Sequence, residues 1–190
     1  MGNSASSALP PLQTAPKCET ARFMGTWFVH GVKPTYFEKT NSNAVEKYTL
    51  LENKKHDIDI DFQYNQDDPM TSKLKSLPQK GWLAGANRAN TSLWTVSPMW
   101  PIKMPYLILE VDEAKYEYAV IGYPSRDYCW ILGRRPQMPE ATYNKLVKAL
   151  EEKHQYNLDG LRRVPQKWTR EEREKRGLTE EEVPDSMLSK

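Results

Sequence analysis

The 190-residue chain is poor in the features that define several large classes of protein. Two cysteines, Cys18 and Cys129, and three scattered histidines are too few for a disulfide scaffold or a zinc cluster. The longest apolar runs fall far short of the ~20 residues of a membrane-spanning helix, and no N-terminal block resembles a secretion signal. A net charge of +2 does not indicate a nucleic-acid-binding surface. We therefore expect a cytoplasmic protein without metal or cofactor that neither spans a membrane nor binds nucleic acid.

The chain does contain a series of short segments in which apolar and polar residues alternate, separated by turn residues about every ten positions. Eight strands are predicted, at Gly25–Val32, Val45–Glu52, Asp57–Tyr64, Thr71–Ser76 continuing through Lys80–Ala86, Ser92–Ser97, Tyr106–Val111, Glu117–Tyr123 and Asp127–Arg134. Sequential antiparallel strands of this kind build an all-β domain, either a sandwich or a closed barrel. An eight-stranded barrel has room inside for one small ligand.

The segments on either side of the strands differ in character. Residues 1–20 are small, polar and proline-containing, which predicts a flexible N-terminal arm. After Pro136 the apolar period changes to that of a helix, and the helix is expected to pack outside the sheet through Tyr143, Leu146, Val147 and Leu150. Residues 166–190 are rich in charge and poor in apolar side chains, so we interpret them as a charged extension, disordered or bound to a protein partner.

Two motifs indicate the kind of barrel. The segment Phe23–Phe28 contains Gly25-Thr26-Trp27, and about 100 residues later the segment Tyr118–Arg134 contains Pro124-Ser125-Arg126-Asp127-Tyr128 followed by Trp130-Ile131-Leu132 and Arg134. The first resembles the glycine-x-tryptophan signature that opens the first strand of lipocalins, and the second resembles their last two strands. Across residues 21–165 the chain is similar to bacterial outer-membrane lipocalins, apolipoprotein D and plant temperature-induced lipocalins. This resemblance implies an eight-stranded up-and-down barrel.

Within such a barrel, Trp27 is expected to close the narrow end with the guanidinium of Arg134 stacked on its ring. Neighbouring strand residues point to opposite faces, so Arg135 is out of register for this role. The resemblance, with strand parity, implies that a set of mostly aromatic residues lines the interior and binds ligand: Tyr128, Trp130, Ile121, Tyr106, Ile108 and Trp94. The alternative is that these residues fill a solid core. Both cysteines are expected to be free thiols, with Cys129 on the outer face beneath the helix.

The segment Ser97–Pro105 is unusually apolar for a loop. Its three prolines are expected to exclude a ladder strand, which would place Met99, Trp100 and Ile102 in a loop at the open mouth of the barrel. One interpretation is a membrane-dipping or ligand-gating lip. The other is a loop that folds back over its own barrel.

The first six residues fit the acceptor pattern for N-myristoylation, with Gly2 as the acylated residue. One acyl chain binds membranes only marginally, so a second contact is expected from the apolar loop or from a palmitoylated Cys18. The alternative is that the match arises by chance.

Three functions compete. A carrier would hold a fatty acid, lysolipid, isoprenoid or similar small hydrophobic ligand in the barrel, at a membrane surface. An enzyme would need a reactive cysteine or an interior carboxylate; the first strand has no cysteine, and Glu110 is the one carboxylate with possible inward parity. A scaffold subunit of a membrane-associated assembly would use the charged tail for docking. The prediction is a non-enzymatic carrier without catalytic residues.

Overall fold

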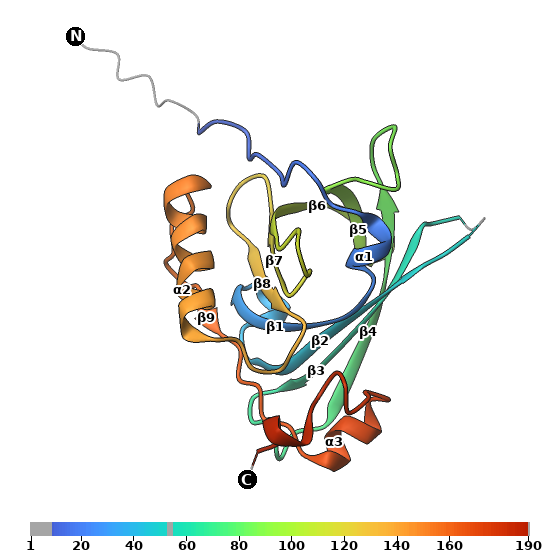
Figure 1. Ribbon diagram of the computed structural model, residues 1–190, viewed down its shortest axis with the longest axis vertical. Helices are drawn as coiled ribbons and strands as arrows, with labels where there is room; N and C mark the ends of the chain where they lie inside the picture. Colours follow the sequence, from blue (N-terminus) through green and yellow to red (C-terminus); the bar gives the residue numbers. More distant parts are fainter. Residues whose placement is uncertain (1–8, 53–54, 190) are drawn as a thin grey trace.

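The computed structural model describes residues 9–52 and 55–189, and its strands form one continuous sheet (Figure 1). The strands are β1 Gly25–Lys33, β2 Asn41–Leu50, β3 Ile58–Gln66, β4 Leu74–Leu83, β5 Leu93–Met99, β6 Ile102–Val111, β7 Tyr118–Gly122, β8 Cys129–Gly133 and β9 Arg162–Arg163. The helical segments are α1 Thr20–Phe23, α2 Glu140–Lys148 and α3 Arg170–Lys175, with short turns η1 Tyr36–Glu38, η2 Ala149–Lys153 and η3 Asp185–Met187.

Neighbouring strands pair antiparallel in chain order from β2 to β8, and β1 then pairs with both β8 and β2, which closes an eight-stranded barrel. The pairing of β1 with β2 covers only Gly25–Phe28. Further along β1, the short strand β9 pairs with Gly31 and Val32. The predicted barrel is therefore confirmed, and β9 adds a strand that occupies the part of the β1 edge that β2 leaves free.

Helix α2 packs on the outside of the barrel, as predicted (Figure 1). Its residues Tyr143, Leu146 and, in the following turn, Leu150 are buried against the outer faces of β6, β7 and β8. Cys129 is part of this contact, as expected from its parity, and both cysteines are free.

The C-terminal extension is not the loose appendage that its composition predicted. Trp168 and Val183 are 1% and 0% exposed, and they pack with Phe28 and Val45 on the outer face of β1 and β2. The prediction was wrong because these few apolar residues are spread over a long charged stretch, and because buried arginines such as Arg176 bond to the barrel. Charge in this segment is thus partly structural.

The described part of the N-terminal arm, residues 9–20, is also fixed to the barrel rather than flexible. The backbone of Ala15 donates to Ile108 O and accepts from Ser92 Oγ, and Cys18 N donates to the side chain of Asn90. Backbone hydrogen bonds of this kind leave no hydrophobic signature in the sequence, which explains the error. Gly2 lies outside the described residues.

The predicted loop at Ser97–Pro105 is a hairpin. Strands β5 and β6 continue to Met99 and from Ile102, and Pro105 pairs with Thr95. The prolines are tolerated because the hairpin extends past its neighbours: β4 pairs with β5 only as far as Ser97, and β7 pairs with β6 only from Leu107. No ladder hydrogen bond to a flanking strand is lost.

Candidate functional site

The closed end of the barrel is formed by the predicted pair. The guanidinium carbon of Arg134 lies 3.7 Å from the centre of the Trp27 ring, which is fully buried. Arg134 also donates to the carbonyl oxygens of Thr26 and Arg22, at 3.0 and 2.7 Å, and the Trp27 indole donates to Phe23 O. Burial lowers the pKa of Arg134 to about 10, so the group remains charged at neutral pH. The pair closes the barrel floor through both packing and hydrogen bonds.

Most of the residues predicted to line the interior do belong to the buried cluster inside the barrel. This cluster includes Trp94, Tyr106, Ile108 and Ile121, with Trp130 partly buried against it. The parity assigned to β7 and β8 is therefore correct for these positions. Because β5 and β6 obey the same alternation here, the ring of Trp94 stacks on that of Tyr106, with centroids 5.5 Å apart.

Two of the predicted orientations were wrong. Tyr128 precedes β8, so strand alternation does not govern it, and its ring packs against Tyr123 rather than in the interior cluster. On β6, an irregularity between Ile108 and Glu110 shifts the register. Glu110 therefore bonds outside the barrel, to Lys153 at the end of η2 and to His154, which follows it. The carboxylate that sequence parity offered for the interior is therefore an outer-face residue.

A different carboxylate, Glu46 on β2, lies inside. Its Oε2 accepts a short hydrogen bond from the Tyr48 hydroxyl, and the Tyr48 and Tyr106 hydroxyl oxygens are 2.6 Å apart. The other oxygen, Oε1, has no hydrogen-bond partner among the residues that the structure describes. It keeps some access to solvent, because the fully buried side-chain atoms without a partner in this part of the chain belong to Asn41, Ser97 and Arg162. These three side chains, which we call the interior polar cluster, are surrounded by aromatic and aliphatic residues.

Burial dominates the electrostatics of this cluster. Removal from water raises the pKa of Glu46 to about 7, the hydrogen bond from Tyr48 opposes the rise, and the nearby carboxylate of Glu38 adds to it. The pKa values of Tyr48 and Tyr106 are raised for the same main reason, so both phenols stay protonated. Among the described residues, no lysine or arginine contributes to the titration of Glu46. The cluster is thus an uncompensated acidic site that titrates near neutrality.

The interior becomes more accessible away from the floor. Trp27 and Phe23 are fully buried, whereas Tyr64, Leu77 and Trp130 on the open half of their strands are only partly buried. The η1 turn lies at this end, where Glu38 accepts a hydrogen bond from the Trp130 indole at 2.8 Å. The barrel is therefore sealed at one end and approachable at the other.

The β5–β6 hairpin tip carries three exposed apolar side chains at the open end. Met99, Trp100 and Ile102 are 56%, 67% and 56% exposed. The tip leans on the outer face of β4, with the rings of Trp100 and Trp82 6.5 Å apart and Lys103 Nζ 4.1 Å from the Trp82 ring centre. The segment therefore does not cover the barrel mouth, and it leaves an apolar surface in water.

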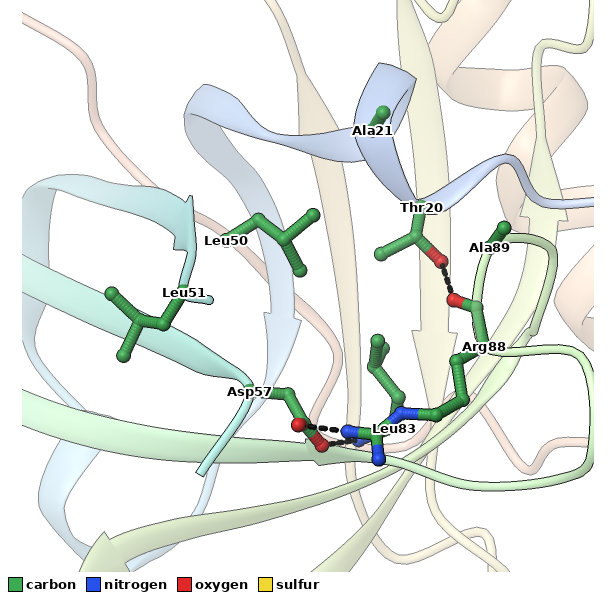
Figure 2. Close-up of a pocket in the computed structure, with 8 residues that line it drawn as sticks. All are labelled: Thr20, Ala21, Leu50, Leu51, Asp57, Leu83, Arg88 and Ala89. Carbon is green, nitrogen blue, oxygen red and sulfur yellow. Dashed lines mark hydrogen bonds and ion pairs between the residues drawn. The ribbon is translucent and has the colours of Figure 1, made fainter. Parts of the chain in front are cut away.

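A separate pocket of about 560 Å³ lies outside the barrel at its closed end (Figure 2). Figure 2 shows Thr20 and Ala21 of α1 on one side, and Leu50, Leu83 and the ion pair between Asp57 and Arg88 on the others. The Thr20 hydroxyl donates to Arg88 O, and Asp57 accepts from the backbone of Leu83. The polar groups that line the pocket are bonded to one another. These hydrogen bonds and the ion pair hold α1 against the ends of the strands.

The basic side chains of Arg126 and Lys103 do not face the interior of the barrel. Arg126 is buried and donates to the carbonyl oxygens of His154 and Pro10, while Lys103 lies on the outer surface. Within the described part of the chain, no group of three or more His, Cys, Asp or Glu side chains is arranged to hold a metal ion. No helix of these residues is long and apolar enough to cross a membrane.

Comparison with known proteins agrees with this architecture. Residues 18–166 match the profile of the Lipocalin-like domain. Temperature-induced lipocalin-1 of Arabidopsis thaliana is 46% identical over 70 residues, a match that covers 36% of each chain. The outer membrane lipoprotein Blc of Citrobacter freundii is 26% identical over 144 residues, which cover 75% of this chain and 77% of Blc. Insecticyanin from the tobacco hornworm Manduca sexta has the same fold, with a TM-score of 0.61 at 13% identity over 86% of this chain and 88% of its own.

A closed eight-stranded antiparallel barrel with a Trp–Arg floor, an apolar interior and one packed outer helix defines the lipocalin class. The chain belongs to the Lipocalin-like family, which is known for binding small hydrophobic ligands. Residues 167–190 lie beyond the matched region, and Trp168, Leu178 and Val183 among them cover the outer face of β1 and β2.

Proposed function

We propose that the protein binds a small hydrophobic ligand, such as a fatty-acyl or isoprenoid lipid, in the barrel interior. The observation that carries this proposal is the change in burial along the barrel, from the sealed floor at Trp27 to the partly exposed Tyr64, Leu77 and Trp130 at the open half. Apolar surface transferred from water into such an interior contributes about 25 cal/mol per Å². A lipid chain can then bind without covalent chemistry.

We propose binding rather than catalysis. Two described histidines contact carboxylates, His154 with Glu110 and His56 with Asp59, and both pairs lie outside the barrel interior. Inside the barrel, the Cys18 thiol has a pKa raised to about 12 by burial, which disfavours the nucleophilic thiolate.

We also propose that the protein works at the surface of a membrane. The exposed Met99, Trp100 and Ile102 next to Lys103 suit an interfacial contact, because tryptophan prefers the head-group region and lysine attracts anionic lipids. An acyl chain on Gly2 would bind the membrane only marginally by itself. The acyl chain and the hairpin tip together would supply the two contacts that stable binding requires.

The ligand proposal is tested by gentle purification from the native source, solvent extraction and mass spectrometry of the extract. A lipid present in near-equal molar amount supports the carrier. A protein that yields no lipid and fails to take up Nile red supports a solid core and a scaffold role. Chemical conversion of an added lipid would instead support an enzyme.

The membrane proposal is tested with the double variant Trp100→Ser, Ile102→Ser and with Gly2→Ala, each scored by partition between membrane and soluble fractions. Release by both variants is expected if both contacts are needed. An unmodified N-terminus by intact mass, together with a soluble distribution of the parent protein, would refute the anchor. A protein partner for the C-terminal extension stays a prediction, and pull-down with and without residues 167–190 tests it.

A further inference from the structure

We infer that the interior polar cluster of Glu46, Tyr48 and Tyr106 is a head-group site that selects lipids ending in an uncharged hydrogen-bond donor, such as an alcohol, over lipids ending in a carboxylate. This inference rests on the proposed function, because it assigns the class of ligand that the barrel interior takes. It follows from three properties of the cluster: the direction of its hydrogen bonds, its uncompensated charge, and its depth in the barrel.

The direction of the hydrogen bonds leaves acceptors unfilled. Tyr48 has one hydroxyl proton and gives it to Glu46 Oε2. In the 2.6 Å contact between the two phenols, Tyr106 must therefore be the donor and Tyr48 the acceptor. Both phenolic protons are then used, while Glu46 Oε1 has no partner among the described residues. Because Oε1 keeps some access to solvent, a ligand in the interior can reach it, and a ligand that supplies a donor there replaces the hydrogen bond to water that its binding removes.

The charge of the cluster opposes an anionic ligand. Glu38 is a second carboxylate close enough to affect Glu46. The hydrogen-bonded groups beside it are neutral phenols, since Tyr48 bonds to Glu46 and Tyr106 bonds to Tyr48. Two like charges brought together in a weakly polar interior repel strongly. A carboxylate head group at this position would also offer no proton to Oε1 when ionised. A hydroxyl group avoids the repulsion and fills the acceptor.

The depth of the cluster sets the orientation of the ligand. Glu46 pairs across the barrel wall with Trp27 of the floor and with Phe62, and the ring of Trp94 lies against Tyr106. Between this level and the mouth, the interior is lined in part by the hydrophobic side chains of Tyr64, Leu77 and Trp130, with Glu38 bonded to the Trp130 indole at the open end. The polar end of the ligand therefore enters first, and the hydrocarbon chain extends towards the mouth.

The experiment compares dodecanol with dodecanoate as competitors of Nile red, a neutral dye, on the full-length protein above about pH 8, where Glu46 is charged. We expect dodecanol to displace the dye at a concentration about tenfold or more below that of dodecanoate. In Glu46→Gln the preference should shrink or reverse, because an amide is uncharged and can donate to a carboxylate. Lowering the pH through about 7 should also weaken the preference in the parent.

Two further variants separate this role from a change in fold. Tyr106→Phe keeps the ring that stacks on Trp94 and removes one hydroxyl of the cluster, so it should reduce alcohol affinity by a smaller factor. Asp59→Asn neutralises an exposed carboxylate on the outward face of β3 and should leave the preference unchanged. Circular dichroism and thermal melts establish that each variant is folded.

The outcomes are distinguishable. Equal affinity for the two competitors, or tighter binding of dodecanoate, would overturn the inference and leave the carrier proposal standing. A preference for the alcohol that survives in Glu46→Gln would overturn the assignment to this cluster. Absence of dye binding and of competition by either lipid would refute the carrier proposal itself, and the inference with it.

Discussion

The raised pKa of Glu46 has a direct consequence for stability. The carboxyl has a pKa near 4.5 in an unfolded chain and about 7 inside the barrel. Below about pH 4.5 the group is protonated in both states and contributes no pH dependence. As the pH rises to about 7, the unfolded chain releases the proton while the folded chain keeps it, so the free energy of unfolding falls. At about 1.4 kcal/mol per pKa unit, the loss between these limits is about 3 kcal/mol.

Glu46→Gln should abolish this loss. The amide is neutral at every pH and still offers an oxygen to Tyr48. We therefore expect the stability of the variant relative to the parent to rise by about 3 kcal/mol between about pH 4.5 and pH 8, whatever the offset from the altered hydrogen bond. Urea unfolding at constant ionic strength, followed by the emission of the six tryptophans, measures the difference.

Glu110→Gln provides the matched control because its linkage has the opposite sign. The hydrogen bond to His154, followed by Lys153, lowers the pKa of the Glu110 carboxyl despite partial burial. Its stabilisation is present above its ordinary pKa and is lost only as the pH falls below it. If the free energy of unfolding changed with pH in the same way in the parent and in Glu46→Gln, our account of the interior would be refuted. The Glu46 carboxylate would then ionise in the folded protein without a loss of stability, which requires that it be hydrated or paired with a cation.

Three further predictions follow from the packing. Trp27→Ala should cost about 3–5 kcal/mol of unfolding free energy, and it should be non-additive with Arg134→Ala in a double-mutant cycle; strict additivity would contradict the stack. Removing residues 167–190 uncovers Phe28 and Val45 and should lower the Tm by about 10 °C or more, whereas an unchanged melt would show that the covering is dispensable. Dodecanol should change the tryptophan emission of the parent, with a smaller response in Trp130→Phe; an equal response would place Trp130 away from the ligand.

The parts of the fold that the sequence predicted are those controlled by short-range alternation. Where a strand has one apolar and one polar face, as at Ile58, Ile60 and Phe62, the orientation of every residue follows from the pattern. The same regularity, together with the resemblance to lipocalins, placed Trp130 and Ile121 inside the barrel and Cys129 beneath the helix. The Trp27–Arg134 floor was predictable because both residues sit in motifs at a characteristic separation.

Where the backbone is irregular, strand alternation gave the wrong orientation or the wrong secondary structure. One extra residue in β6 is enough to move Glu110 from the inner to the outer face, and no local sequence signal marks that position. Similarly, prolines in β5 and β6 could be reconciled with strands only once the lateral pairing was known to end before them.

Glu46 was missed for a reason that connects the site to the C-terminal extension. Its strand has Val45 and Tyr48 on opposite faces, so both faces read as apolar and alternation gives no orientation. Val45 is apolar because Trp168 and Val183, more than a hundred residues later, cover the outer surface there. Once that cover is assigned, Tyr48 must face inward, and Glu46, two residues before it on the same strand, must do so as well. The acidic group inside the barrel thus becomes recognisable only after the charged tail is understood as part of the fold.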